Sequence, residues 1–200
     1  MDANGKDLWA AGETKPGIWY LNPHQLKAAE LSHLAHAIKD SKMQANATLS
    51  IVSAHIGPNW SWTVSPKLRA LARVLVLEGE VSVVHGHSSH HIQGIEFIDG
   101  KPVMYGLGPF VDDYAIDPIY RNDLSFIYQY DLKSDMPIVW AHAIKIEDFH
   151  VRRIKDKTDP DFQWLATTMD RLCRALGSEV QVEGTPGEPP CLRITPREQG

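Results

Sequence analysis

Cysteines and long apolar runs are scarce in this sequence. Its 200 residues include two cysteines, Cys173 and Cys191, too few for a disulfide framework and typical of a reducing compartment. Neither lies near the histidine-rich segment, so a thiolate-rich zinc site is not expected. No apolar stretch approaches the roughly 20 residues that span a bilayer, and the first residues lack the basic and apolar regions of a secretory signal. These absences predict a cytoplasmic protein without a membrane segment.

Positive charge is not in excess either. The formal net charge is -5, which gives no indication of a nucleic-acid or membrane-surface partner. Hydrophobic residues make up 43% and charged residues 22%, as in ordinary globular domains. The chain contains no internal repeat, and its length suits one domain with a substantial core. We therefore predict a single domain over residues 1–200, with a Pro- and Gly-rich flexible tail over residues 185–200.

The first half of the chain has the pattern of alternating helices and strands. Apolar residues recur at helical spacing over residues 25–42, and residues 48–55 have the composition of a buried strand. A second helix is expected from the capping residue Ser65 to Gly79, followed by a strand over residues 81–85. A strand, a helix and a strand in succession predict parallel pairing through a right-handed crossover.

The second half has the pattern of antiparallel strands and one helix. Asp99-Gly100 is the strongest available hairpin signal, and strands are expected over residues 125–130, 138–146 and 149–154. A final helix is predicted over residues 161–176. Its inward residues are expected to be Trp164, Leu165, Met169, Leu172 and Cys173.

Histidines are concentrated where the second parallel strand ends. The stretch VVHGHSSHH, residues 83–91, contains His85, His87, His90 and His91, and His55 ends the first strand. Parallel strands have their carboxyl ends at one edge of the sheet, where open α/β sheets bind ligands. Neutral imidazole is the commonest metal ligand, so this convergence predicts a divalent metal site. The alternative is that the histidines occupy an exposed loop.

The segment HIGPNWSW, residues 55–62, follows the first strand and could line the same site. Asn59 could hydrogen-bond a substrate oxygen, and Trp60 and Trp62 could wall a pocket, although tryptophans in such loops pack as often as they bind. Further along, Asp112 and Asp113 are either metal or acid-base carboxylates at this edge or solvated loop residues.

One other metal-site interpretation fails. The pair His85 and His87 has the H-x-H spacing of cupin barrels, but the next glutamate, Glu96, lies nine residues beyond His87. The helix predicted between the two strands also argues against an all-β barrel.

In this order, SAHIGPNW (residues 53–60), residues 83–114 and YRNDLSFIYQYDL (residues 120–132) resemble the CapA-type family of bacterial poly-gamma-glutamate capsule biosynthesis proteins, which have a metallophosphatase-like domain. The resemblance spans about residues 8 to 195. It implies a mixed α/β fold, a calcineurin-like four-layer α/β/β/α sandwich with α+β mixed sheets. It also implies a divalent metal, such as Mn, Fe or Zn, and phosphoesterase-like hydrolase chemistry.

The resemblance also suggests residue roles. His55 and His90 match metal ligands, and His87 or His85 would act as catalytic proton donor or substitute ligand, because Ser88 stands where the family usually has a histidine. From the residues themselves, Asn59 and Trp60 are expected to contact a small-molecule or polymer substrate, with a phosphorylated substrate as one alternative. Pro109 replaces the amide that the family usually places after Leu-Gly.

The upstream motifs of the family, Gly-Asp, Asn-Leu-Glu and Asn-Asn-His, do not occur in this chain. The chain therefore resembles the rear half of the family domain. Two functions follow as alternatives: a metal-dependent phosphoesterase, or a non-catalytic capsule-assembly or binding module that lacks the upstream metal ligands. A third alternative is that a half-sandwich with exposed strand edges does not fold stably alone.

Overall fold

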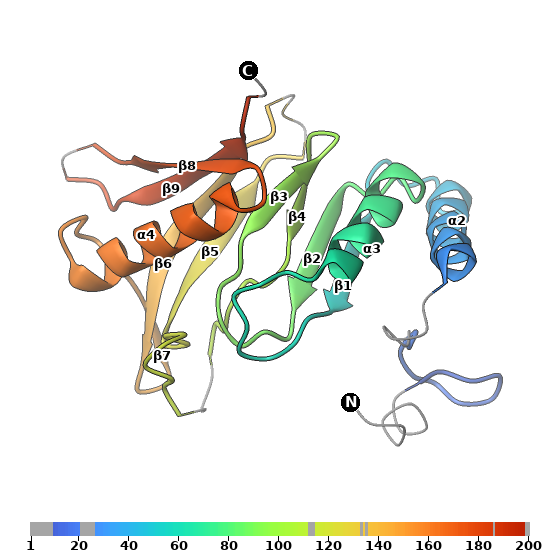
Figure 1. Cartoon of the computed structure of the whole chain (residues 1–200), viewed down its shortest axis with the longest axis horizontal. Helices are drawn as coiled ribbons and strands as arrows, with labels where there is room; N and C mark the ends of the chain where they lie inside the picture. The colour runs from blue at the N-terminus through green and yellow to red at the C-terminus, as the bar shows by residue number, and fades with distance from the viewer. Residues whose placement is uncertain are drawn as a thin grey trace.

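The fold is mixed α/β, as predicted, and is built on two sheets. A computed structural model describes residues 10–20, 27–111, 115–132, 134, 136–185 and 187–198. One sheet has the strand order β1-β2-β4-β3, and the other has the order β5-β6-β9-β8 with β7 also paired to β6 (Figure 1). The helices are α2 (Ala28–Gln44), α3 (Pro66–Leu77) and α4 (Pro160–Arg174). The strands are β1 (Ile51–His55), β2 (Val83–His87), β3 (Ile95–Ile98), β4 (Lys101–Met104), β5 (Leu124–Tyr130), β6 (Val139–Glu147), β7 (His150–Arg153), β8 (Ser178–Glu183) and β9 (Cys191–Pro196).

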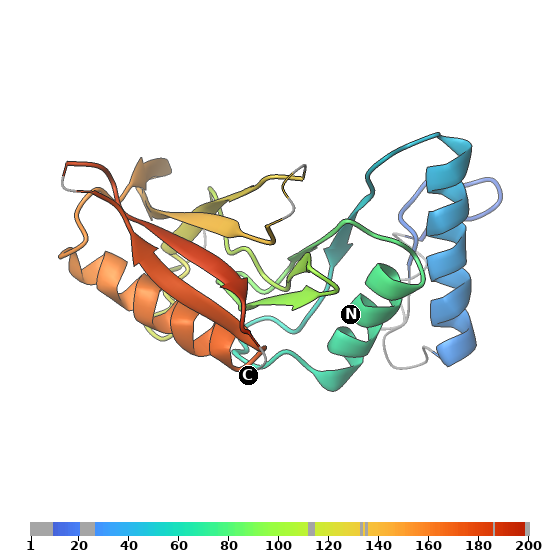
Figure 2. The same ribbon diagram turned by 90° about the horizontal axis from the view of Figure 1, so that it is seen from above.

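The predicted strand–helix–strand unit is present as β1, α3 and β2, and the two strands pair in parallel. The helix begins where the sequence indicates, because the backbone N–H of Leu68 donates to Ser65 Oγ over 3.3 Å and Pro66 occupies the first turn. Its buried residues are Leu71, Ala72, Leu75 and Val76, which pack in one cluster with Val84, Val103 and Tyr105 of the sheet side. Helices α3 and α2 lie side by side at the β1 end of the molecule (Figures 1 and 2).

The prediction that the first strand is buried is wrong. β1 is the edge strand of its sheet, and the side chain of Ile51 is 60% exposed. The apolar composition suited a buried strand, but among the described residues β1 has β2 as its only neighbouring strand.

The predicted hairpin at Asp99-Gly100 is confirmed and joins β3 to β4. Both turn residues have positive φ angles, 50° and 71°, as the central pair of a type I′ turn requires. The hairpin returns the chain so that β4 pairs in parallel with β2, His85 lying opposite Met104.

The second sheet confirms the antiparallel strands predicted after residue 124. β5 pairs with β6 and β6 with β7, all antiparallel. Helix α4 begins at the Asp159 cap, whose carboxylate accepts from the Asp161 N–H over 2.8 Å. Of its predicted inward residues, Trp164 is partly buried, whereas Leu165, Met169, Leu172 and Cys173 are buried. The helix packs on strands of both sheets and shares one core with them.

The prediction of a flexible tail from residue 185 is wrong for residues 191–196. They form β9, which lies between β6 and β8 and pairs with both. Leu192 and Ile194 have no exposed surface and belong to the main core. The strand is short, its neighbours in the sequence are rich in proline and glycine, and its pairing partner β6 is distant in the sequence. The local sequence therefore does not indicate a strand here.

The close approach of β2 to the segment after β4 depends on Gly86. A Cβ atom at this position would lie 2.5 Å from the carbonyl oxygen of Tyr105 and 2.6 Å from that of Met104. Both are backbone atoms, so we expect Gly86→Ala to lower the free energy of unfolding by more than about 2 kcal/mol, measured by urea denaturation. Gly12→Ala is the matched control, because a Cβ there would meet no heavy atom within 4 Å. Equal denaturation midpoints for the two variants would contradict this account of β2.

Candidate functional site

Four side chains meet at the carboxyl ends of β1 and β2, and we call Ser53, His55, His85 and His87 the histidine edge. The parallel register pairs Ser53 with His85 and His55 with His87. The His55 and His87 rings meet edge-on with centroids 5.2 Å apart, and those of His85 and His87 are 5.6 Å apart. The predicted convergence of His55 with the histidines of the second strand is therefore confirmed. Alternation along the strands brings all four side chains to one face of the sheet.

A hydrogen bond orients His85, and burial favours the neutral form of His87. Ser53 Oγ and His85 Nδ1 share a hydrogen bond of 3.0 Å, which orients the His85 ring and leaves Nε2 for another partner. Burial lowers the pKa of His87, and the neighbouring His55 and His85 lower it further. The neutral form favoured by these effects is the form in which imidazole binds a metal.

The pair His55 and His87 fits a shared divalent ion, but the described residues do not supply a complete donor set. Two imidazoles bound to one metal at about 2.1 Å have centroids roughly 5 Å apart, close to the 5.2 Å found here. Within the described ranges, no group of three or more His, Cys, Asp or Glu side chains is arranged to hold a metal ion. Asp112 and Asp113 lie outside the described residues. The metal role of His55 stays a prediction.

His90 lies beyond the end of β2, in a turn where its φ is 64°. Its ring stacks on Trp60, with centroids 5.6 Å apart and an interplanar angle of 20°. The role of His90 as a metal ligand and those of His85 and His87 in catalysis also stay predictions. The exposed Asn59 and the partly buried Trp60 lie in the loop that follows β1.

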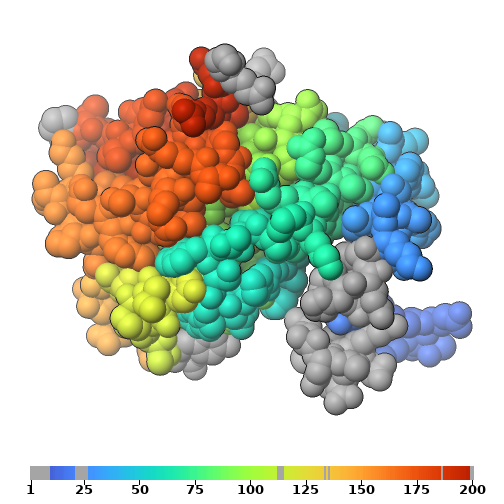
Figure 3. Space-filling model, in the orientation of Figure 1, coloured from blue at the N-terminus to red at the C-terminus, as the bar shows by residue number. Residues whose placement is uncertain are grey.

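A cluster of aromatic rings joins this loop to the rest of the molecule. Trp62 lies 4.8 Å from His91 and 4.7 Å from Tyr120 between ring centroids, and Trp60 also contacts Tyr120. The Trp62 ring further contacts Trp164 of α4. Figure 3 shows the loop after β1, the segment near residue 120 and α4 meeting on one face, in teal, yellow and orange. Trp60 and Trp62 thus pack in this cluster, and substrate contact by Trp60 stays a prediction.

His91 is the centre of this cluster, a position that sequence analysis did not identify. The side chain has no exposed surface. Its Nδ1 donates to the carbonyl oxygen of Ile92 over 2.8 Å, and Nε2 accepts from the N–H of Ser61 over 3.2 Å. The neutral Nδ1–H tautomer satisfies both bonds, and burial lowers the pKa of His91. His91 thus ties the loop that carries Trp60 to the segment after β2.

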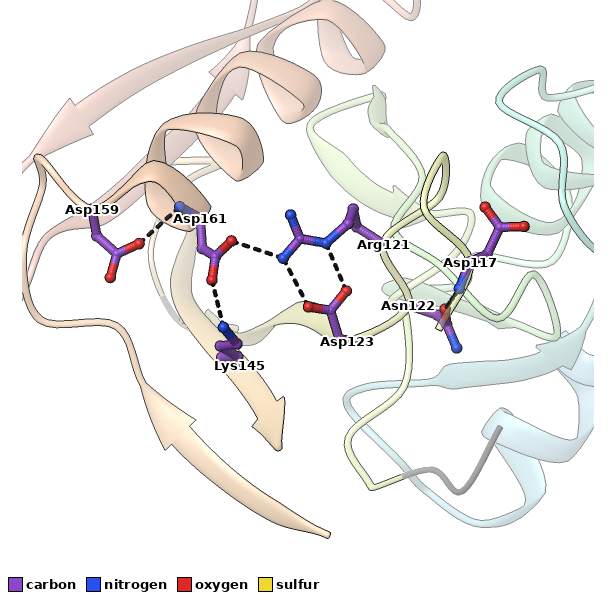
Figure 4. A network of polar contacts seen from close by, with 7 residues as sticks. All are labelled: Asp117, Arg121, Asn122, Asp123, Lys145, Asp159 and Asp161. Carbon is purple, nitrogen blue, oxygen red and sulfur yellow. Dashed lines mark hydrogen bonds and ion pairs between the residues drawn. The ribbon is translucent and has the colours of Figure 1, made fainter. Parts of the chain in front are cut away.

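A network of ion pairs holds the second sheet to α4 near the same face (Figure 4). The Arg121 guanidinium donates to both carboxylate oxygens of Asp123 over 2.8 Å and to Asp161 over 2.7 Å. Lys145 Nζ donates to the other Asp161 oxygen over 2.9 Å. Burial acts to raise the pKa of Asp161, but the bonds from Lys145 and Arg121 outweigh it and lower that pKa. These charged side chains are paired with one another, and their role is structural.

A pocket of about 370 Å³ opens beside the histidine edge. It lies between the ends of β2 and β4, the loop of residues 107–110 and strand β5. Its lining residues are His85, Met104, Leu107, Gly108, Pro109, Phe110, Ser125, Phe126 and Tyr128. Of the predicted site residues, His85 is the one that lines this pocket as well as the histidine edge.

Comparison with known proteins adds a family to this geometry. The family model for bacterial capsule synthesis protein PGA_cap matches residues 2–114. These residues include all four side chains of the histidine edge. Neither cysteine is in a disulfide, and no helix in the described part of the chain is long and apolar enough to cross a membrane.

Several curated proteins are similar over most of the chain. A protein of Mycobacterium tuberculosis, described as a probable polyglutamine synthesis accessory protein, is 33% identical over 182 residues, which cover 87% of this chain and 46% of the relative. The capsule biosynthesis protein CapA of Bacillus anthracis is 31% identical over 178 residues, covering 86% of this chain and 41% of the relative. The chain therefore spans less than half the length of these curated relatives.

The buried neutral His91 predicts a pH dependence of stability. Because its folded pKa lies below its unfolded value of about 6.5, its contribution is fully present above pH 6.5 and is lost as the pH falls through the folded pKa. We expect His91→Gln to lower the free energy of unfolding at pH 7.5, measured by urea denaturation, by about 1–3 kcal/mol. Between about pH 6.5 and 5, the variant should lose less stability than the wild type does. The exposed His36 on α2 provides the control His36→Gln. Parallel pH profiles for the wild type and His91→Gln would show that His91 does not govern this dependence.

Proposed function

Because this chain belongs to the bacterial capsule synthesis protein family PGA_cap, we propose that it acts in the synthesis of a glutamate-based capsule polymer. We further propose that the histidine edge is the site of a metal-dependent phosphoester hydrolase. The M. tuberculosis relative is described by polyglutamine synthesis and the B. anthracis relative by capsule biosynthesis, which supports a role in the synthesis of a capsule polymer. A cytoplasmic location, consistent with the two free cysteines, is part of the same proposal.

The observation that carries the hydrolase proposal is the meeting of three imidazoles at the carboxyl edge of two parallel strands. The His87 ring centroid lies 5.2 Å from that of His55 and 5.6 Å from that of His85. Structural histidines are usually satisfied singly by backbone groups, as His91 is here. Paired imidazoles at a partly open edge instead match the ligand chemistry of Mn, Fe or Zn.

Each side chain of the edge has a task in this proposal. His55 and His87 would hold a divalent ion, with His90 as the further ligand that the sequence predicts. Such an ion would polarise a phosphoryl oxygen and lower the pKa of bound water. With the Nε2–H tautomer of His85, Ser53 Oγ would donate to Nδ1 across their 3.0 Å hydrogen bond, and Nε2 could give its proton to a substrate oxygen. Asn59 and Trp60, in the loop after β1, would contact the substrate.

A non-catalytic capsule-assembly or binding module is the second candidate. It is favoured by the donor set, which in the described ranges falls short of three side chains. Pro109 also offers no side-chain hydrogen bond where the family usually has an amide. The M. tuberculosis relative is itself described as an accessory protein.

Loss of metal-dependent activity in His55→Ala tests the hydrolase. We expect the wild type to hydrolyse p-nitrophenyl phosphate with added Mn²⁺, Fe²⁺ or Zn²⁺, and His55→Ala to lose about 100-fold or more in kcat/KM, because one of two paired ligands is removed. The control His36→Ala removes an exposed histidine outside the site and should keep full activity.

The same assay separates the two candidates. A folded wild type that hydrolyses neither p-nitrophenyl phosphate nor its diester with any of these ions would contradict the hydrolase proposal. Binding of polyglutamate by that inactive protein would then establish the binding module.

A further inference from the structure

We propose that the pocket beside His85 binds the apolar alcohol portion of a phosphomonoester whose phosphate lies at the histidine edge. This inference rests on the proposed function, since it names the substrate class of the same site. It depends on three features of the described residues: a fixed wall, an apolar lining and the position of His85.

The wall formed by residues 107–110 is held at Leu107 and Gly108 by contacts with Ile92 and Ser125. Ser125 Oγ donates to the carbonyl oxygen of Leu107 over 2.8 Å, and Leu107 also forms a β-bridge with Ile92. Gly108 has a φ of 75°, and a Cβ there would lie 2.7 Å from Ser125 Oγ. The loop therefore packs directly on β5, which makes the pocket a preformed cavity of the kind that binds small ligands.

The lining selects an apolar occupant. Met104, Leu107, Pro109, Phe110 and Phe126 make up most of it, the polar groups are those of His85, Ser125 and Tyr128, and none of the described lining residues is Lys, Arg, Asp or Glu. A volume of about 370 Å³ lies at the small end of the usual range for ligand sites, roughly 300–1,000 Å³. A carboxylate or polyol placed here would lose hydration without an ionic partner, whereas a hydrocarbon chain gains by burial.

His85 determines the orientation of the ligand. It lines the pocket and also stands beside His87, 5.6 Å away between ring centroids. A ligand with an apolar chain in the pocket therefore brings its polar end to three neighbouring imidazoles. A phosphomonoester has three free oxygens, one more than a carboxylate, so it can contact the ion proposed at His55 and His87 and also accept from His85 Nε2–H.

The test compares n-hexyl phosphate with methyl phosphate, whose alcohols differ by methylenes alone. Titration calorimetry on the whole chain, with and without Mn²⁺, measures the two dissociation constants. At about 4-fold per buried methylene, burial of two or three methylenes predicts roughly 30-fold tighter binding of the hexyl ester. Hexanoate against acetate forms the carboxylate arm, and we expect hexanoate to bind more weakly than hexyl phosphate.

Two variants locate the binding. Phe110→Ala and Leu107→Asn should reduce the preference for hexyl over methyl phosphate by about 5-fold or more. Phe110 is 57% exposed, so its removal should leave the fold intact. The matched control Phe149→Ala removes a phenylalanine that is 66% exposed, in the turn between β6 and β7, and should not change the preference.

Equal affinities for hexyl and methyl phosphate, or an unchanged preference in both pocket variants, would overturn the inference. Hexanoate binding as tightly as hexyl phosphate would overturn the assignment of the phosphate. Failure of the proposed function gives a different result: selective binding of hexyl phosphate with no hydrolysis contradicts the hydrolase and supports the pocket.

Discussion

The parallel pairing of β1 with β2 is the constraint on which the rest of the site depends. Its register places His55 beside His87 and Ser53 beside His85, although 32 residues of sequence separate the members of each pair. The crossover helix α3 makes this pairing possible, and its capped start and buried face fix where the second strand begins. A shift of one residue would turn the imidazoles to the opposite face, so the register determines the chemistry.

The second sheet completes the site through its packing rather than through ionisable groups. Strand β5 supplies a wall of the pocket, and its residue Ser125 holds the loop of residues 107–110. The position of β5 depends on α4, which shares the core of both sheets and is joined to Arg121 and Lys145 by the Asp161 carboxylate. His91 and the aromatic rings around it fix the loop after β1 to the same region.

Local signals in the sequence were enough for the elements that position the histidines. The Ser65 cap, the period of α3 and the Asp99-Gly100 turn each act within a few residues, and the β1–β2 convergence follows from them. The burial of His91 and the Ser53–His85 bond depend on register and tertiary packing, which no local pattern specifies. The strand β9 was concealed for the same reason, because it is stabilised by β6 and β8 and lies in a Pro- and Gly-rich segment. The pocket is formed by three segments that are distant in the sequence, so it could not be predicted from any local pattern.

The most direct test of the central claim is whether the histidine edge binds a divalent ion as one unit. Nuclear magnetic resonance of the protein carrying ¹⁵N-labelled histidine, titrated with Mn²⁺, reports on each imidazole by paramagnetic broadening. We expect the signals of His55, His85 and His87 to broaden together at substoichiometric Mn²⁺, before those of His36 and His142. Uniform broadening of all histidines, or none at the edge, would contradict it.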